Sequence, residues 1–136
     1  MEANEIVVDV DNRTGYELEQ YYETVAKAAV GALKHEGVQA CGVSVSFVLN
    51  EEIKVLNKRY RGQDKVTDVL SFPAIDDFAK LPGGHFELGD VVIAYDKAAK
   101  QAAEYGHSLM REIGFLTVQW SNKNATALSR AGSWLR

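Results

Sequence analysis

Strand-type and helix-type patterning alternate along this chain of 136 residues. Apolar residues recur at every second position in Ile6–Val10, and the β-branched run Val43–Leu49 shows the same alternation, which is typical of strands. Between these runs, the apolar positions of Tyr16–Glu36 follow helical spacing, and Gly37 is the expected end of that helix. The order strand, helix, strand predicts a sheet with helices packed against it.

The second half of the chain continues this alternation. We expect a helix over Asn50–Arg59, with Asn50 as its cap and Tyr60 on its buried side. A strand over Asp68–Pro73 and an irregular loop over Ala74–Gly84 should follow. The remaining expected elements are a strand over Asp90–Tyr95 that is buried on both faces, a helix that is capped by Asp96 and ends at Gly106, and a last helix from Ser108. We therefore predict one α+β domain with a small mixed four-stranded sheet and helices packed on it.

Composition narrows the class of protein. Apolar residues make up 46% and charged residues 25% of the chain, which is typical of a globular domain. No apolar run reaches the roughly 20 residues that span a bilayer, and the acidic start MEANEIVVDVDN does not resemble a secretory signal. The single Cys41 cannot form an internal disulfide. We expect a cytoplasmic protein with no membrane partner and no DNA partner. The net charge of −4 argues against nucleic-acid binding by the domain as a whole, although local cationic patches can still bind phosphate.

Four cations lie at the predicted end of the helix that starts at Asn50 and in the turn after it: Lys58, Arg59, Arg61 and Lys65. One interpretation is that they complement the partial negative charge of the helix terminus. The other is that Arg61, next to Gly62, directs a planar two-pronged donor at a phosphate. Arg59, Arg61 and Lys65 are the candidate nucleic-acid-binding residues of the second interpretation, although residue types alone favour the first.

Three strings in this chain resemble the YbeY family of bacterial ribosomal-RNA maturation factors: YRGQDKVTDVLSFP, LGDVVIA at 88–94 and QAAEYGHSLMREIGFLTV at 101–118. The resemblance covers residues 1–118. It implies a small α+β hydrolase that is a metal-dependent, single-strand-specific endoribonuclease acting in ribosomal RNA maturation and ribosome quality control. It also implies that Arg61 is the catalytic, phosphate-contacting residue and that ribosomal RNA or ribosome-associated factors are partners.

The resemblance further implies a zinc site of three histidines, spaced HxxxHxxxxxH, directly after Val118. A three-histidine site leaves a position open for water and lowers the pKa of that water. Here the three positions fall on Gln119, Lys123 and Ser129, none of which is a credible zinc ligand. We therefore predict no metal ligands and no bound zinc in this chain as written. A replacement site from His85, Glu87, Asp90 and His107 is the alternative.

The same position marks a break in composition. No acidic residue follows Glu112, and both tryptophans, Trp120 and Trp134, lie beyond Val118. A change that replaces all downstream residues at once is what a frame change in the gene or a sequencing error produces. We interpret residues 119–136 as an atypical, poorly ordered tail in place of the family's metal-binding segment.

Three hypotheses about function follow. The first is an rRNA-processing endoribonuclease whose family reaction is attack of metal-activated water on a phosphodiester, with this chain inactive as written. The second is a non-catalytic module that binds RNA or the ribosome. The third is a domain that folds around the three strings but ends in a frayed tail and has neither activity.

Overall fold

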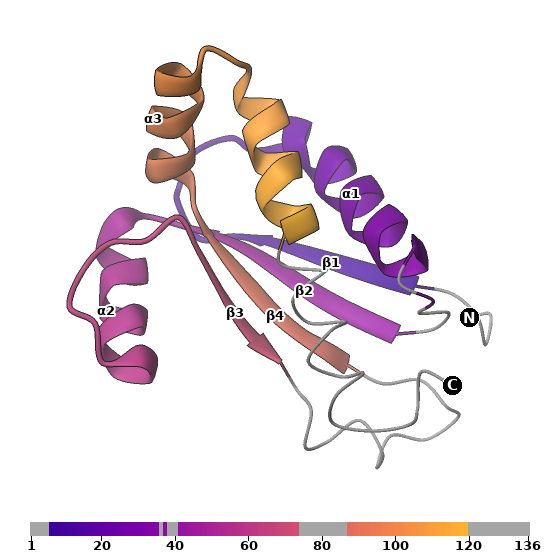
Figure 1. Ribbon diagram of the computed structural model, residues 1–136, viewed down its shortest axis with the longest axis horizontal. Helices are drawn as coiled ribbons and strands as arrows, with labels where there is room; N and C mark the ends of the chain where they lie inside the picture. The colour runs from indigo at the N-terminus through magenta and orange to yellow at the C-terminus, as the bar shows by residue number, and fades with distance from the viewer. Residues whose placement is uncertain (1–5, 36, 38–40, 74–86, 120–136) are drawn as a thin grey trace.

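The computed structural model describes residues 6–35, 37, 41–73 and 87–119, and Figure 1 shows their arrangement. The elements, in chain order, are β1 (Ile6–Asn12), the 3₁₀ helix η1 (Glu19–Tyr21), α1 (Tyr22–His35), β2 (Cys41–Val48), α2 (Asn50–Arg61), β3 (Val69–Pro73), β4 (Glu87–Ala94) and α3 (Tyr95–Tyr105). A further helical segment covers 109–119. The expected loop 74–84, His85 and the tail beyond Gln119 lie outside the described residues.

The four strands form one sheet in the order β1-β2-β4-β3. β1 pairs with β2 and β2 pairs with β4 in parallel, and Val45 of β2 lies opposite both Val10 and Val91. β3 pairs with β4 in the antiparallel sense, with Leu70 opposite Val92. The prediction of a small mixed four-stranded sheet in an α+β fold is confirmed.

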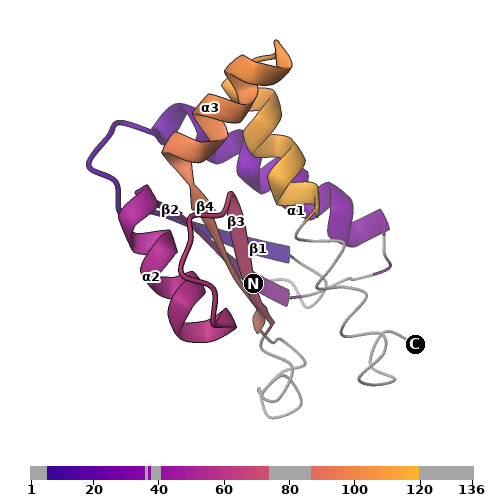
Figure 2. The same ribbon diagram turned by 60° about the vertical axis from the view of Figure 1, so that its left-hand side comes forward.

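Helices cover both faces of the sheet. α1, α3 and the segment 109–119 lie together on one face, whereas α2 lies apart from them, as the two views show (Figures 1 and 2). The side chains of β4 alternate accordingly: Val91 and Ile93 join the larger core, while Val92 joins a smaller cluster with Ile53 of α2. The expectation that this strand is buried on both faces is confirmed. Among the described helices, none is long and apolar enough to cross a membrane.

The first helix begins later than its periodicity predicts, because polar side chains occupy the backbone groups before it. The amide of Asn12 donates to the carbonyl of Tyr16 at 2.6 Å, and the hydroxyl of Thr14 accepts from the N–H of Tyr16 at 3.0 Å. Such local bonds compete with helix formation. The chain therefore reaches helical geometry at η1, and α1 starts at Tyr22.

Three local expectations for the later helices are wrong. Leu49 and Ala94, not Asn50 and Asp96, are the capping residues of α2 and α3, and neither makes a side-chain cap bond. Tyr60 is not on a buried face, since 58% of its surface is exposed. The inward face of α2 is set instead by Ile53 and Asn57, which are four residues apart.

Candidate phosphate-binding pocket

A pocket of about 340 Å³ lies between the C-terminal end of α2, the segment that leads into β3, and the end of the helix 109–119. Its lining residues are Asn57, Arg61, Gln63, Lys65, Thr67, Asp68, Val69, Leu70, Ser71 and Gln119. The structure thus brings together two of the three predicted nucleic-acid-binding residues, Arg61 and Lys65. It also places Gln119, the first of the three expected ligand positions, in the same pocket.

A left-handed residue and a buried amide shape this end of α2. Gly62 has φ +71°, which turns the chain out of the helix, and its N–H bonds to the carbonyls of Asn57 and Lys58. The side chain of Asn57, which is buried, donates to the carbonyl of Lys65 at 3.0 Å. These contacts fasten the turn that carries Lys65 to the helix that carries Arg61.

The guanidinium of Arg61 is held against β3 at the pocket. Its Nη2 donates to the carbonyl of Ser71 in β3 at 3.0 Å. A guanidinium has five N–H donors, and this is the one hydrogen bond between the Arg61 guanidinium and the described residues. The side chain is exposed, so the remaining donors are available to a phosphate at the fork geometry that arginine favours.

Arg59 does not line this pocket. Its guanidinium lies 5.5 Å from the ring centroid of Tyr60, and it lines a separate surface hollow with Lys54, Val55, Lys58 and Asp64. The structure therefore separates Arg59 from the other two candidate residues, and its predicted role in nucleic-acid binding stays a prediction.

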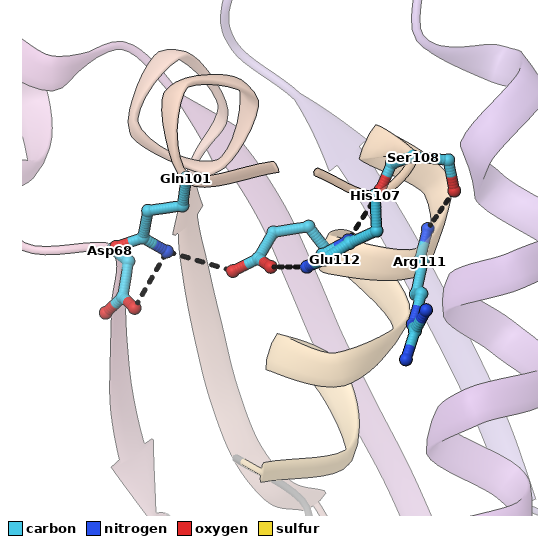
Figure 3. Close-up of polar contacts among 6 residues, drawn as sticks. All are labelled: Asp68, Gln101, His107, Ser108, Arg111 and Glu112. Atoms are coloured by element: carbon cyan, nitrogen blue, oxygen red, sulfur yellow. Dashed lines mark hydrogen bonds and ion pairs between the residues drawn. The ribbon is translucent and has the colours of Figure 1, made fainter. Parts of the chain in front are cut away.

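Asp68 places a carboxylate in the pocket and connects it to a polar network behind it (Figure 3). The Nε2 of Gln101 in α3 donates to Asp68 at 3.4 Å and to Glu112 of the helix 109–119 at 2.9 Å. The other oxygen of Glu112 lies 3.2 Å from Nε2 of His107. Glu112 is only 2% exposed, and Gln101 and His107 are partly buried. These three polar side chains form a connected network behind Asp68.

The sequence interpretation missed Gln101 and Glu112. One signal was present: Glu112 stands three residues after Leu109 and four before Leu116, and so on the apolar side of its helix. A carboxylate at such a position requires polar partners. Nothing in the local sequence indicates that Gln101 and His107 are those partners.

The pocket does not offer the ligands of a zinc centre. Gln119 supplies an amide, and the pocket also contains the cations of Arg61 and Lys65, which oppose a metal ion. Among the described residues, no three His, Cys, Asp or Glu side chains are grouped so as to hold a metal. Lys123 and Ser129 lie outside the described residues. A three-histidine centre does not fit the residues present.

Of the alternative ligand set, only the side chains of His107 and Asp90 are among the described ones, so that alternative stays a prediction. His107 lies in the connection between α3 and the helix 109–119, where its Nε2 contacts Glu112. Asp90 lies in β4, opposite Ser44 and Phe72 of the neighbouring strands. Burial raises the pKa of Asp90 above its usual value.

A small α+β domain with a cationic pocket at a helix terminus defines a class of protein suited to binding phosphate groups. Comparison with known proteins narrows that class. The family model described as "Endoribonuclease YbeY" matches residues 8–119, and the chain belongs to this family. The matched segment ends at Gln119, the residue at which the expected histidine string would begin.

Relatives and a solved structure agree with this assignment. The endoribonuclease YbeY of Alkaliphilus metalliredigens is 50% identical over 113 residues, which cover 80% of this chain and 73% of the relative. That of Bacillus licheniformis is 44% identical over 119 residues, which cover 83% and 75%. The solution structure of TM1509 from Thermotoga maritima has a TM-score of 0.55 and 17% identity, with 96% of each chain covered. That structure supports the fold.

Proposed function

We propose that this chain binds single-stranded ribosomal RNA in the manner of a ribosomal-RNA-processing endoribonuclease and, as written, does not cut it. The observation that carries the proposal is the pocket itself, in which Arg61 and Lys65 face the same space while Gln119 stands at a position expected for a metal ligand. Two cations that line one pocket can bind a phosphodiester. Neither cation can generate a hydroxide nucleophile, so we expect this chain to bind RNA without cleaving it.

The division of labour between the two cations follows from their chemistry. Arg61, oriented by the carbonyl of Ser71, offers two parallel N–H groups to two phosphate oxygens. Lys65 acts as a mobile point charge on the same phosphate or its neighbour. Ribosomal RNA and ribosome-associated factors are the proposed partners, and a cytoplasmic location belongs to the same proposal.

Binding of a labelled single-stranded RNA, measured by fluorescence anisotropy at several salt concentrations, tests the proposal. The wild-type chain should bind, and with two phosphate contacts the logarithm of its affinity should fall with that of salt with a slope near −1.4. Arg61→Ala should weaken binding about tenfold and make the slope shallower by about 0.7. Arg111→Ala is the matched control, because Arg111 is also exposed but lies outside the pocket.

The family assignment supports a second candidate, hydrolysis of RNA by this chain. Metal content of the purified protein and a gel assay of the same RNA separate the two. One zinc per chain together with cleavage would replace the binding proposal by the catalytic one. Intact RNA after incubation, combined with Arg61-dependent binding, supports the binding proposal. Absence of both binding and cleavage would leave only a folded domain.

A further inference from the structure

Asp68 is the one carboxylate that lines the described pocket, and its presence there is electrostatically unfavourable for an anionic ligand. A carboxylate within a phosphate site repels the phosphate. The chain nevertheless holds Asp68 in place on both sides: its carbonyl accepts from the N–H of Ala94 at 2.9 Å, and its side chain accepts from Gln101. In a pocket that binds RNA, the carboxylate of Asp68 would be favourable only if a hydrogen-bond donor of the RNA contacts it.

The ribose 2′-hydroxyl is such a donor, and it is the group that distinguishes RNA from DNA. We propose that Asp68 accepts a hydrogen bond from the 2′-hydroxyl of the nucleotide whose phosphate Arg61 and Lys65 bind. Asp68 is then the residue that makes the pocket selective for RNA over DNA. The inference rests on the proposed function and adds to it the contact that reads the sugar.

The network behind the pocket orients the carboxylate of Asp68. The two hydrogens of the Gln101 amide are directed to Oδ2 of Asp68 and to Oε2 of Glu112. Because Glu112 accepts hydrogen bonds and cannot donate when ionised, it fixes the amide nitrogen of Gln101, not its oxygen, toward Asp68. Each oxygen of Asp68 thus has one long side-chain contact among the described residues, Oδ2 with Gln101 at 3.4 Å and Oδ1 with the Thr67 hydroxyl at 3.5 Å. Because a carboxylate has about four acceptor positions, the Asp68 carboxylate keeps acceptor capacity for the ligand.

Gln101 is therefore a positioning residue that acts through Asp68. Glu112 in turn holds Gln101, and His107, at 3.2 Å, holds Glu112. Figure 3 shows this chain of contacts running from the pocket residue Asp68 through α3 to the helix 109–119. Loss of the Gln101 donor should release the carboxylate of Asp68 without removing any group from the pocket.

The test compares three single-stranded probes of one base sequence: RNA, DNA and 2′-O-methyl RNA. Wild-type protein should bind RNA about tenfold more tightly than either other probe, since a hydrogen bond to a charged acceptor has about this effect. The 2′-O-methyl probe keeps an RNA-like backbone but lacks the donor. It therefore tests the contact without any change to the protein.

Asp68→Ala should remove the preference for RNA over DNA. Affinity for DNA should rise, because the repulsion between the carboxylate and the phosphate is gone, whereas affinity for RNA should not rise in proportion. Asp64→Ala is the matched control, since Asp64 carries the same charge close in sequence, is exposed and lies outside this pocket. It should raise both affinities together and leave their ratio unchanged.

Gln101→Met keeps the length of the side chain but removes the donor, and it should lower the RNA-to-DNA affinity ratio while the Arg61-dependent salt slope persists. A purely structural role of Gln101 would lower thermal stability and leave that ratio intact. Equal binding of the three probes by wild-type protein would overturn this inference and leave RNA binding standing. An unchanged ratio in Asp68→Ala would do the same, and failure to bind any probe would overturn the proposed function as well.

Discussion

Arg59 and Arg61 show how the position of a residue around a helix decides which surface its side chain joins. Residues two apart on an α-helix point roughly 200° away from each other. Arg61 consequently faces β3 and reaches Ser71, while Arg59 faces outward and covers Tyr60. A count of cations in the segment 58–65 cannot distinguish the pocket residue Arg61 from the outward-facing Arg59. The direction of each side chain places the two residues on different surfaces.

The planar shape of Arg61 leads to a prediction. Arg61→Lys keeps the positive charge but cannot bind two phosphate oxygens at once. We expect RNA affinity to fall about threefold to tenfold while the salt slope stays that of the wild-type chain. Anisotropy titrations over the same salt series measure both quantities. A loss of slope equal to that of Arg61→Ala would show that lysine does not reach the phosphate at all.

Asp90 gives a prediction about pH. Partial burial raises the pKa of this carboxyl in the folded protein, so the folded state holds the proton more tightly than the unfolded state. Stability is therefore lost as pH rises from the unfolded value through the higher folded pKa. Asp90→Asn should remove that loss and raise the free energy of unfolding at pH 7, by less than about 0.5 kcal/mol because the side chain is exposed. Urea unfolding at pH 3.5 to 7 measures this, and parallel profiles for the two proteins would contradict it.

At the scale of elements, the ends of helices were harder to predict than their existence. Periodicity identified α1, α2 and α3, and the glycine stop at Gly106 is confirmed by its left-handed φ of +72°. The starts were less accurate because they depend on competing local bonds, as at Asn12 and Thr14 before α1. Confirmed strands include the one that ends at Pro73.

Gly62 provides a prediction at this scale. An added Cβ would meet no atom within 4 Å, so the cost of Gly62→Ala is the left-handed backbone alone, about 1–2 kcal/mol. Gly31→Ala is the control, since Gly31 lies exposed within α1 with equally open space, and alanine should stabilise it by about 0.5–1 kcal/mol. Free energies of unfolding from denaturant titrations should change in opposite directions. Equal changes would refute the role assigned to the conformation of Gly62.

At the scale of the whole molecule, the sheet carries the pocket between its two sets of helices. α2 supplies Arg61, the strand β3 and the turn before it supply Ser71 and Asp68, and the helix 109–119 supplies Gln119. The net charge of −4 correctly describes a domain without an overall basic surface, yet it does not describe this local pair of cations. The proposed binding of phosphate depends on this local pair and not on the net charge.

Zinc offers a test on the intact protein. A ligand that binds only the folded state raises its stability, by about 2.7 kcal/mol at one hundred times its dissociation constant. Because the residues present do not fit a three-histidine centre, we expect neither added Zn²⁺ nor a chelator to change the melting temperature. Differential scanning calorimetry measures this. A rise of several degrees with Zn²⁺ would show that the chain assembles a metal site from other residues.

The sequence by itself determined the types and order of the elements, the mixed four-stranded sheet, the family, and the nomination of Arg61 and Lys65. These depend on local periodicity and on strings of neighbouring residues. Tertiary structure alone decided that Arg59 leaves the pocket, and that Asp68, Gln101 and Glu112, far apart in the chain, share one hydrogen-bonded network. The physical reason is that contacts between distant segments depend on how helices pack across the sheet, and no local pattern encodes that packing.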